Sequence, residues 1–421
     1  MLIIINFIIF SALIFYAIVF YIRAEKCIKI IKKQKTNLET NCNKEIIIAI
    51  PCLREQSCIE ETIKYFRKIA KYITIIIITT QKEEKENTNN DVLTREIIKK
   101  KILPKYENVC LIDYPKTDGY MADQLNYMLE NLELILKRKI DLSNTYLALY
   151  NADSRPNKRT FDEVKAKINQ GHKVIQQYSY CMKNYKALSN ILKGFSIYQS
   201  NFELKTGIVN GILKSKLLYT HVVGHGLIIN METLKELGDF NTEFWCEDIY
   251  LGLQLKFNNL DIEPMLTLEN METPTKLKNL IKQNSVWFKT TSQFSKIYRD
   301  IISKGSLKNR LNGFIGCFNE FRCAINWLCF PMLLVFFIVS SILIKSCKIL
   351  VADIISYLLY IEINTIMTIK LINILDKTNY KVSLKMILNV AIATAISNFG
   401  PIYSIITNKK KKYKTERGNY E

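Results

Sequence analysis

Apolar and polar positions divide this chain of 421 residues into three regions. Residues 1–22 contain no charged side chain. As a helix with a rise of ~1.5 Å per residue, this stretch is long enough to cross a hydrocarbon core of about 30 Å. Near the other end lie three further apolar stretches, at residues 324–344, 349–372 and 386–407. In the middle, short apolar runs alternate with longer helical patterns. The pattern predicts a folded central domain flanked by membrane segments.

The central region has the pattern of an α/β domain. Apolar runs predict strands at residues 45–50, 73–79, 109–114 and 145–150. Helical periodicity lies between them, at residues 59–70, 92–101 and 121–137. The predicted strands are apolar throughout, which is typical of a mainly parallel sheet that helices cover on both faces. Because ligands of such sheets bind beyond the carboxyl ends of the strands, the chemistry is expected there.

The first apolar stretch predicts a retained membrane anchor. A cleaved signal peptide is the alternative, but the stretch has no basic start, is long, and precedes no small-residue cleavage site. Basic residues follow it directly, at 23, 26, 29, 32, 33 and 35. By the positive-inside rule, the central region is then expected in the cytosol.

The C-terminal stretches raise a question of topology. Four full spans would place the basic residues 408–421 outside, so one of the three C-terminal stretches is predicted not to be a simple span. The middle stretch is the weakest, because it carries Asp353, Glu362 and Lys370 and charges inside a span are costly. Just upstream, residues 309–326 mix apolar and polar side chains, as an interfacial helix does.

The formal net charge of +20 is concentrated beside the apolar stretches. Residues 23–35 carry +5, residues 276–310 carry +8 and residues 409–421 carry +4, which together make 17 of the 20. This distribution indicates contact with anionic membrane lipids and argues against a nucleic-acid partner, which would require a basic soluble domain.

The cysteines show no C-x-x-C pair, which argues against a zinc site.

Polar side chains follow the predicted strands at the expected edge. After the first, third and fourth strands come Pro51 with Glu55, Asp113 with Lys116, and Asn151 with Asp153. A carboxylate beside an amide supplies oxygen ligands of the kind that a divalent cation needs when it bridges two phosphates. The alternative is that Asp153 merely caps a helix beginning near Pro156.

Later motifs add further candidates. Gly224-His225-Gly226 precedes a short apolar run, residues 227–229. Glu247-Asp248 opens a predicted helix, either as N-terminal acids that the helix dipole favours or as a general base. Gln283 and Trp287 lie on a basic amphipathic stretch, where the tryptophan is either a core or interfacial anchor or a platform for a sugar ring.

Taken together and in this order, these residues resemble the membrane-bound family 2 glycosyltransferases, which include cellulose, chitin and hyaluronan synthases. Asn151-Ala152-Asp153 stands at the place of the family's D-x-D motif, Cys246-Glu247-Asp248 at its T-E-D, and Gln283 with Trp287 at its Q-x-x-R-W. The similarity covers about residues 45–290 and the flanking membrane segments. It implies a GT-A fold, a nucleotide-sugar donor, a Mg or Mn ion and inversion at the anomeric carbon.

The resemblance also implies a role for each matching residue. Asp153 would bind the metal that holds the donor diphosphate. Asp248 would be the base that takes the proton from the acceptor hydroxyl, with Glu247 beside it. The residues expected to bind the acceptor are Gly224, His225, Gly226, Gln283 and Trp287. The residues expected to bind the donor are Pro51, Glu55, Asp113, Lys116, Asn151 and Asp153.

Two positions depart from the family pattern. Asn151 replaces the first acid of the D-x-D, and Val286 replaces the arginine, whose charge Lys282 or Lys289 would have to supply. The leading interpretation is inverting transfer of a sugar to a membrane-associated glycan or lipid acceptor on the cytosolic face, in cell-surface polysaccharide synthesis. The alternative is a non-catalytic membrane subunit that scaffolds a synthase complex.

The predicted organisation has four parts. An N-terminal transmembrane anchor is expected at residues 1–22 and a cytosolic GT-A domain at residues 43–302. An interfacial helix and the C-terminal transmembrane segments are expected at residues 309–407, followed by a basic tail at residues 408–421. The expected partners are the nucleotide-sugar donor, the acceptor and membrane lipids.

Overall fold

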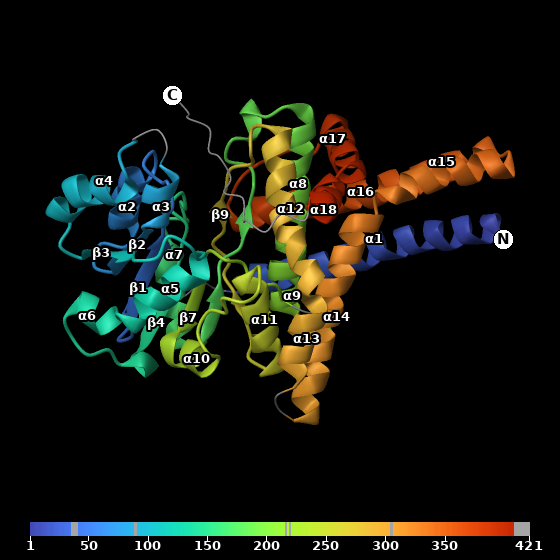
Figure 1. The fold of residues 1–421 in the computed structure, drawn as a ribbon. Coiled ribbons are helices and arrows are strands. Elements are labelled where there is room, and N and C mark those ends of the chain that lie inside the picture. Colours follow the sequence, from blue (N-terminus) through green and yellow to red (C-terminus); the bar gives the residue numbers. More distant parts are fainter. Residues whose placement is uncertain (35–40, 88–90, 215–216, 219, 304–305, 408–421) are drawn as a thin grey trace.

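The computed structural model describes residues 1–34, 41–87, 91–214, 217–218, 220–303 and 306–407. The predicted basic tail, residues 408–421, lies outside the described residues. An α/β part with a central sheet occupies one side of the molecule, and apolar helices, among them α1 and α15, project from the other (Figure 1).

A seven-stranded mixed sheet with the order β3-β2-β1-β4-β7-β5-β8 forms the centre of the α/β part. The four strands predicted from the sequence are β1 to β4, and they pair in parallel. β7 runs antiparallel to β4 and β5. The strands are β1 Glu45–Pro51, β2 Thr74–Thr80, β3 Val109–Tyr114, β4 Thr145–Leu149, β5 Val174–Gln176, β7 Leu227–Asn230 and β8 Glu263–Pro264, and β6 Ser179–Tyr180 pairs with β9 Glu269–Asn270 in a second small sheet.

Helices cover both faces of the large sheet, as the continuous apolar pattern predicts. Along β1, Ile46, Ile48 and Ile50 face one core, which α2 and α7 complete. Ile47 and Ala49 point the other way, into a core shared with α5, α10 and α11. This alternation follows from the two-residue period of a strand.

The helices of the α/β part differ from the predicted ones in two places. The pattern at residues 92–101 forms a short α-helix followed by a π-helical turn, Ile98–Ile102. The pattern at residues 121–137 is broken at Asn131, whose side chain donates to the carbonyl of Tyr127 at 2.8 Å and competes with the helix backbone. The helices are α2 Ile59–Ile69, α3 Lys82–Glu86, α4 Thr94–Ile97, α5 Met121–Glu130, α6 Leu132–Leu136, α7 Thr160–Asn169, α8 Asn190–Glu203, α9 Asn210–Leu213, α10 Met231–Glu236, α11 Glu247–Phe257, α12 Leu277–Lys289 and α13 Phe294–Ile302.

Among the described residues, three helical segments are long and apolar enough to cross a membrane: Leu2–Lys33, Cys347–Leu375 and Leu384–Thr407. The pair Leu307–Cys329 and Met332–Ile344 passes the same test together but bends by 53°. These helices are α1 Leu2–Lys33, α14 Leu307–Cys329, α15 Met332–Ile344, α16 Cys347–Leu375, α17 Leu384–Ala395 and α18 Phe399–Thr407.

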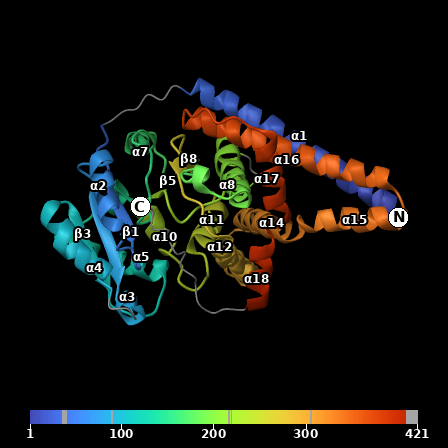
Figure 2. The same ribbon diagram turned by 90° about the horizontal axis from the view of Figure 1, so that it is seen from above.

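The middle C-terminal stretch forms α16, which is long and apolar enough to cross a membrane, so whether it is a simple span stays a prediction. α16 lies beside α1 in both views (Figures 1 and 2). Two of its three charges are placed within protein contacts: Lys370 forms an ion pair with Glu25 of α1, and Asp353 is buried. The free-energy cost of a charged side chain in such a helix therefore depends on whether it faces protein or lipid.

The last apolar stretch packs closely against the α/β part. A Cβ on Gly194 of α8 would lie 2.0 Å from the carbonyl oxygen of Asn389 in α17. A Cβ on Gly400 of α18 would lie 2.5 Å from the Cβ of Asn284 in α12. Glycine at these two positions permits the close approach of α17 and α18 to α8 and α12.

Candidate functional site

A cavity of about 770 Å³ extends from the carboxyl edge of the large sheet to the apolar helices. α8, α12, α14 and α16 contribute to its walls. Of the residues predicted from the sequence, those that line it are Pro51, Glu55, Asn151, Gly224, His225, Glu247, Asp248, Gln283 and Trp287. Asp113, Lys116, Asp153 and Gly226 are outside the lining set.

The antiparallel direction of β7 explains how distant motifs meet at this edge. Because β7 runs against β4, it begins where β4 ends, with Leu227 opposite Leu149. The amide of Gly226 donates to the carbonyl of Leu149 at 2.7 Å. His225 therefore lies at the same edge as Asn151, although the two are far apart in the sequence.

Asp153 lies half-buried in the turn after β4. It does not cap a helix near Pro156, because α7 begins only at Thr160 and Pro156 forms a β-bridge with Glu269. Nearby, Nδ1 of His225 lies 3.5 Å from Oε2 of Glu269. Burial alone would lower the pKa of His225, but Glu269 and other acids, Asp153 among them, raise it. The raised pKa indicates a negative potential at this corner of the site.

The donor set after β4 is small for a metal ion. Within the described part of the chain, no group of three or more His, Cys, Asp and Glu side chains is arranged to hold one. Asn151 and Asp153 offer an amide and a carboxylate oxygen. These two residues fit a divalent cation that takes its remaining ligands from diphosphate oxygens and water.

Glu247 and Asp248 form the first turn of α11, with Glu247 buried and Asp248 half-buried. Oδ1 of Asp248 accepts a hydrogen bond from the amide of Ile249 at 2.8 Å, which orients the carboxylate. On its other side, Oδ2 faces Gly224: a Cβ on this glycine would lie 3.2 Å from it. Gly224 therefore leaves room for the carboxylate of Asp248 in the cavity wall.

Gly226 has a different reason to be glycine. Its φ is +64°, and a Cβ would lie 2.7 Å from the carbonyl oxygen of Gln177. The left-handed conformation and this close backbone contact both exclude a side chain. Gly226 thus shapes the entry into β7.

α12 presents Gln283, Val286 and Trp287 to the cavity. Their spacing of three and four residues puts them on one helical face. The side chain of Trp287 is 39% exposed, which leaves much of its ring open to a ligand.

Sequence reasoning missed an aromatic pair in the cavity wall. The rings of Tyr120 and Trp245 lie 6.0 Å apart. Lys82 places its Nζ 4.8 Å from the Tyr120 ring centroid, and Lys289 places its Nζ 4.0 Å from that of Trp245. Trp245 could have been found from its position beside the Glu247-Asp248 motif, whereas Tyr120 carried no such signal.

Lys289 is one of the two residues considered as substitutes for the missing arginine. Its ammonium lies over the Trp245 ring, and burial lowers its pKa. Lys289 is outside the lining set, so its link to the cavity is this contact with Trp245, which does line it.

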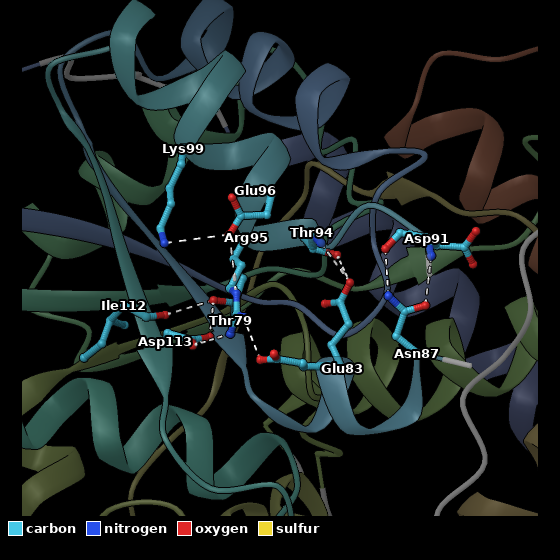
Figure 3. A network of polar contacts seen from close by, with 11 residues as sticks. Thr79, Glu83, Asn87, Asp91, Thr94, Arg95, Glu96, Lys99, Ile112 and Asp113 are labelled. Carbon is cyan, nitrogen blue, oxygen red and sulfur yellow. Dashed lines mark hydrogen bonds and ion pairs between the residues drawn. The ribbon is translucent and has the colours of Figure 1, made fainter. Parts of the chain in front are cut away.

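Asp113 is engaged in a network of polar contacts (Figure 3). Oδ1 accepts from Thr79 Oγ1 at 2.7 Å, and Oδ2 accepts from Arg95 Nη1 at 3.2 Å. Arg95 also contacts Glu84 at 2.6 Å. The network joins β2 and β3 to α3 and α4, so a structural role is favoured for Asp113.

No family model matches the sequence, and no curated protein matches it. Among solved structures, the chain is similar to the mannosyltransferase PcManGT from Pyrobaculum calidifontis, in complex with GDP-Man and Mn²⁺. The similarity covers 97% of this chain and 100% of that chain, with a TM-score of 0.58 and 12% sequence identity. At this identity the likeness shows the fold. It confirms the expected glycosyltransferase fold, and it does not extend to the narrower assignment to family 2.

Proposed function

We propose that this chain is an inverting glycosyltransferase that moves a sugar from a nucleotide-sugar donor to a membrane-associated glycan or lipid acceptor. The observation that carries the proposal is one cavity that joins the strand-end residues of a glycosyltransferase fold, the Glu247-Asp248 turn and the apolar helices. The similar protein was solved with a nucleotide sugar and Mn²⁺, which supports the donor class and the cation.

In this proposal, the donor lies at the carboxyl edge of the sheet. Asn151 and Asp153 would hold a Mg or Mn ion, which supplies positive charge to the diphosphate. The acceptor hydroxyl oxygen attacks the anomeric carbon, its proton passes to Asp248, and the bond to the departing nucleoside diphosphate breaks. Gln283 and Trp287 would hold the acceptor sugar on the opposite side, and Lys289 would add charge near the leaving group.

The helix arrangement supports a topology that keeps this site in the cytosol. Oγ of Ser340 in α15 donates to Oδ1 of Asn6 at 3.1 Å, near the start of α1, whereas Lys370 of α16 meets Glu25, near its end. α16 therefore runs parallel to α1. We assign one inward crossing to α1, an outward passage to the bent pair α14–α15 and an inward one to α16, with α17 and α18 at the cytosolic surface. This count returns residues 408–421 to the cytosol.

Replacing the proposed base tests the function. Asp248→Asn is expected to lower sugar transfer in purified membranes by roughly 10²- to 10⁴-fold, the usual contribution of a general base, while donor binding persists. Asp261→Asn is the matched control, because Asp261 is exposed, follows the far end of the same helix and does not line the cavity. Undiminished turnover in Asp248→Asn would refute the assignment.

The alternative, a non-catalytic scaffold subunit, draws on the departures at Asn151 and Val286. It predicts that no nucleoside diphosphate or nucleotide sugar stabilises the purified protein in a metal-dependent way. A thermal-shift series over the common nucleotide sugars, with and without Mn²⁺, therefore separates the two functions.

A further inference from the structure

Three basic side chains gather in the wall of the cavity where it reaches the apolar helices. Arg23 lies on α1, Lys205 on the π-helical turn Leu204–Val209, and Arg322 on α14, and all three line the cavity. Nη2 of Arg23 donates to Oδ1 of Asn210 at 2.8 Å. Three separate parts of the chain thus bring positive charge to one place, and the proposed function uses none of it.

These three cations form no ion pair with a carboxylate in the part of the chain that the structure describes. The acids that flank them in sequence have other neighbours. These are Glu25, which contacts Lys370, Glu320, which lies 2.8 Å from Nδ1 of His221, and Glu203, which is buried near His225 and His221. Within the described residues, these acids therefore leave the three cations without an ion-paired carboxylate.

The pKa of Lys205 reflects this crowding. Burial and the charges of Arg322 and Arg23 lower it to about 8, and the thiol of Cys323 acts in the opposite direction. Like charges that are held together in a poorly solvated wall repel strongly, and an anionic ligand would relieve the repulsion. Arginine and lysine together are well suited to phosphate, which accepts several charge-assisted hydrogen bonds.

Aromatic side chains lie beside one of the three cations and on the helix that carries another. Nζ of Lys205 lies 4.9 Å from the ring centroid of Phe20, which belongs to the uncharged part of α1. On α14, Phe318 and Phe321 are 55% and 48% exposed, so this helix offers open aromatic surface close in sequence to Arg322. An inorganic phosphate has no apolar part and would gain nothing from these aromatic side chains. A phosphate that carries a hydrocarbon chain would gain from both the cations and the phenylalanines.

We propose that Arg23, Lys205 and Arg322 bind the phosphate group of a membrane lipid. The site stands on its own geometry, but its use rests on the proposed function: the bound lipid would be the carrier of the acceptor, and the cavity leads from its phosphate to Asp248. A lipid-linked acceptor and an ordinary bilayer phospholipid share this chemistry.

Direct binding to the full-length protein in detergent tests the site, with bound lipid read as added mass by native mass spectrometry. The probes are farnesyl phosphate, phosphatidylglycerol and farnesol, which lacks the phosphate. The double variant Lys205→Gln/Arg322→Gln is expected to bind both phosphate lipids at least tenfold more weakly than the wild type. Lys26→Gln is the matched control, because Lys26 is exposed on α1 and does not line the cavity. It should bind as the wild type does.

Competition distinguishes the two lipid sources. Displacement of phosphatidylglycerol by farnesyl phosphate would support a lipid-linked acceptor, and the reverse would support a bilayer phospholipid at the same site. Equal binding by the wild type and the double variant would overturn the proposal, as would farnesol binding as tightly as farnesyl phosphate. Should the double variant unfold, the single variants Lys205→Met and Lys205→Arg decide: the first should lose affinity and the second should keep it.

The site and the function fail separately. Asp248→Asn is expected to bind farnesyl phosphate as tightly as the wild type does. A wild type that binds lipid phosphate but transfers no sugar contradicts only the proposed function. If the wild type transfers sugar but binds lipid no more tightly than the double variant does, only the lipid site is contradicted.

Discussion

Replacing Gly224 with alanine is expected to slow sugar transfer while leaving the stability of the fold nearly unchanged. The added Cβ would lie 3.2 Å from Oδ2 of Asp248 and 3.5 Å from Cε of Met121. The methionine end can yield, so the methyl group displaces mainly the carboxylate, by a few tenths of an ångström. A displacement of about 1 Å in a catalytic geometry costs on the order of 10²-fold in rate. The smaller shift is therefore expected to lower kcat by roughly three- to tenfold.

Gly226→Ala is the informative contrast, two residues away. Its left-handed φ costs about 1–2 kcal/mol for a residue with a Cβ, and the contact at 2.7 Å with the Gln177 carbonyl adds backbone strain. This variant is expected to lose about 2–4 kcal/mol of folding stability. Gly238→Ala isolates the conformational cost alone, because its φ is +88° and nothing lies within 4 Å of the added Cβ.

The assay measures kcat and the thermal midpoint of the purified protein in one detergent for all three variants. Gly224→Ala should differ from the wild type mainly in kcat, Gly226→Ala mainly in the midpoint, and Gly238→Ala should show a small fall in the midpoint only. Full turnover in Gly224→Ala would refute the argument that the carboxylate of Asp248 must stay where Gly224 leaves room for it. A loss of stability in Gly224→Ala equal to that in Gly226→Ala would refute it as well.

Further predictions concern the metal, the acceptor and pH. Asp153→Asn is expected to raise the Mn²⁺ concentration needed for half-maximal transfer, and an unchanged metal titration would contradict its role. Trp287→Ala should raise the acceptor KM several-fold, from the loss of roughly 1 kcal/mol of ring contact, with the donor KM unaltered. Burial alone would lower the pKa of His221, but Glu320 raises it to about 9. This pKa is above that of His221 in the unfolded chain. The His221–Glu320 pair therefore contributes its full folding stability below about pH 6.5, and this contribution is lost as the pH rises through about 9. The thermal midpoint should therefore fall between pH 7 and pH 9.5, and by less in Glu320→Gln.

The strands β1 to β4 could be predicted from the sequence because their signal is local. β1 and β2 are runs of isoleucine between polar residues, and both begin and end within one residue of the prediction. The likeness to a solved glycosyltransferase agrees with the predicted fold class. Local composition therefore carried the fold class, whereas the roles of the candidate acids stay predictions.

What the sequence could not show depends on contacts between distant segments. Nothing near Gly224 indicates that it faces Asp248, and Arg23, Lys205 and Arg322 share no motif. The same holds for α16. The sequence shows that this stretch carries charges, which argued against a span, but it does not reveal that Lys370 meets Glu25 on the neighbouring helix. The candidate site in this chain is assembled largely from such contacts between distant segments.

The most direct test of the central claim is nucleoside diphosphate release by the purified full-length protein, over a panel of nucleotide sugars and with a membrane lipid extract as acceptor source. The account predicts release with at least one donor, dependent on Mn²⁺ or Mg²⁺ and abolished in Asp248→Asn but not in Asp261→Asn. Release that is absent with every donor, or that persists unchanged in Asp248→Asn, would contradict it.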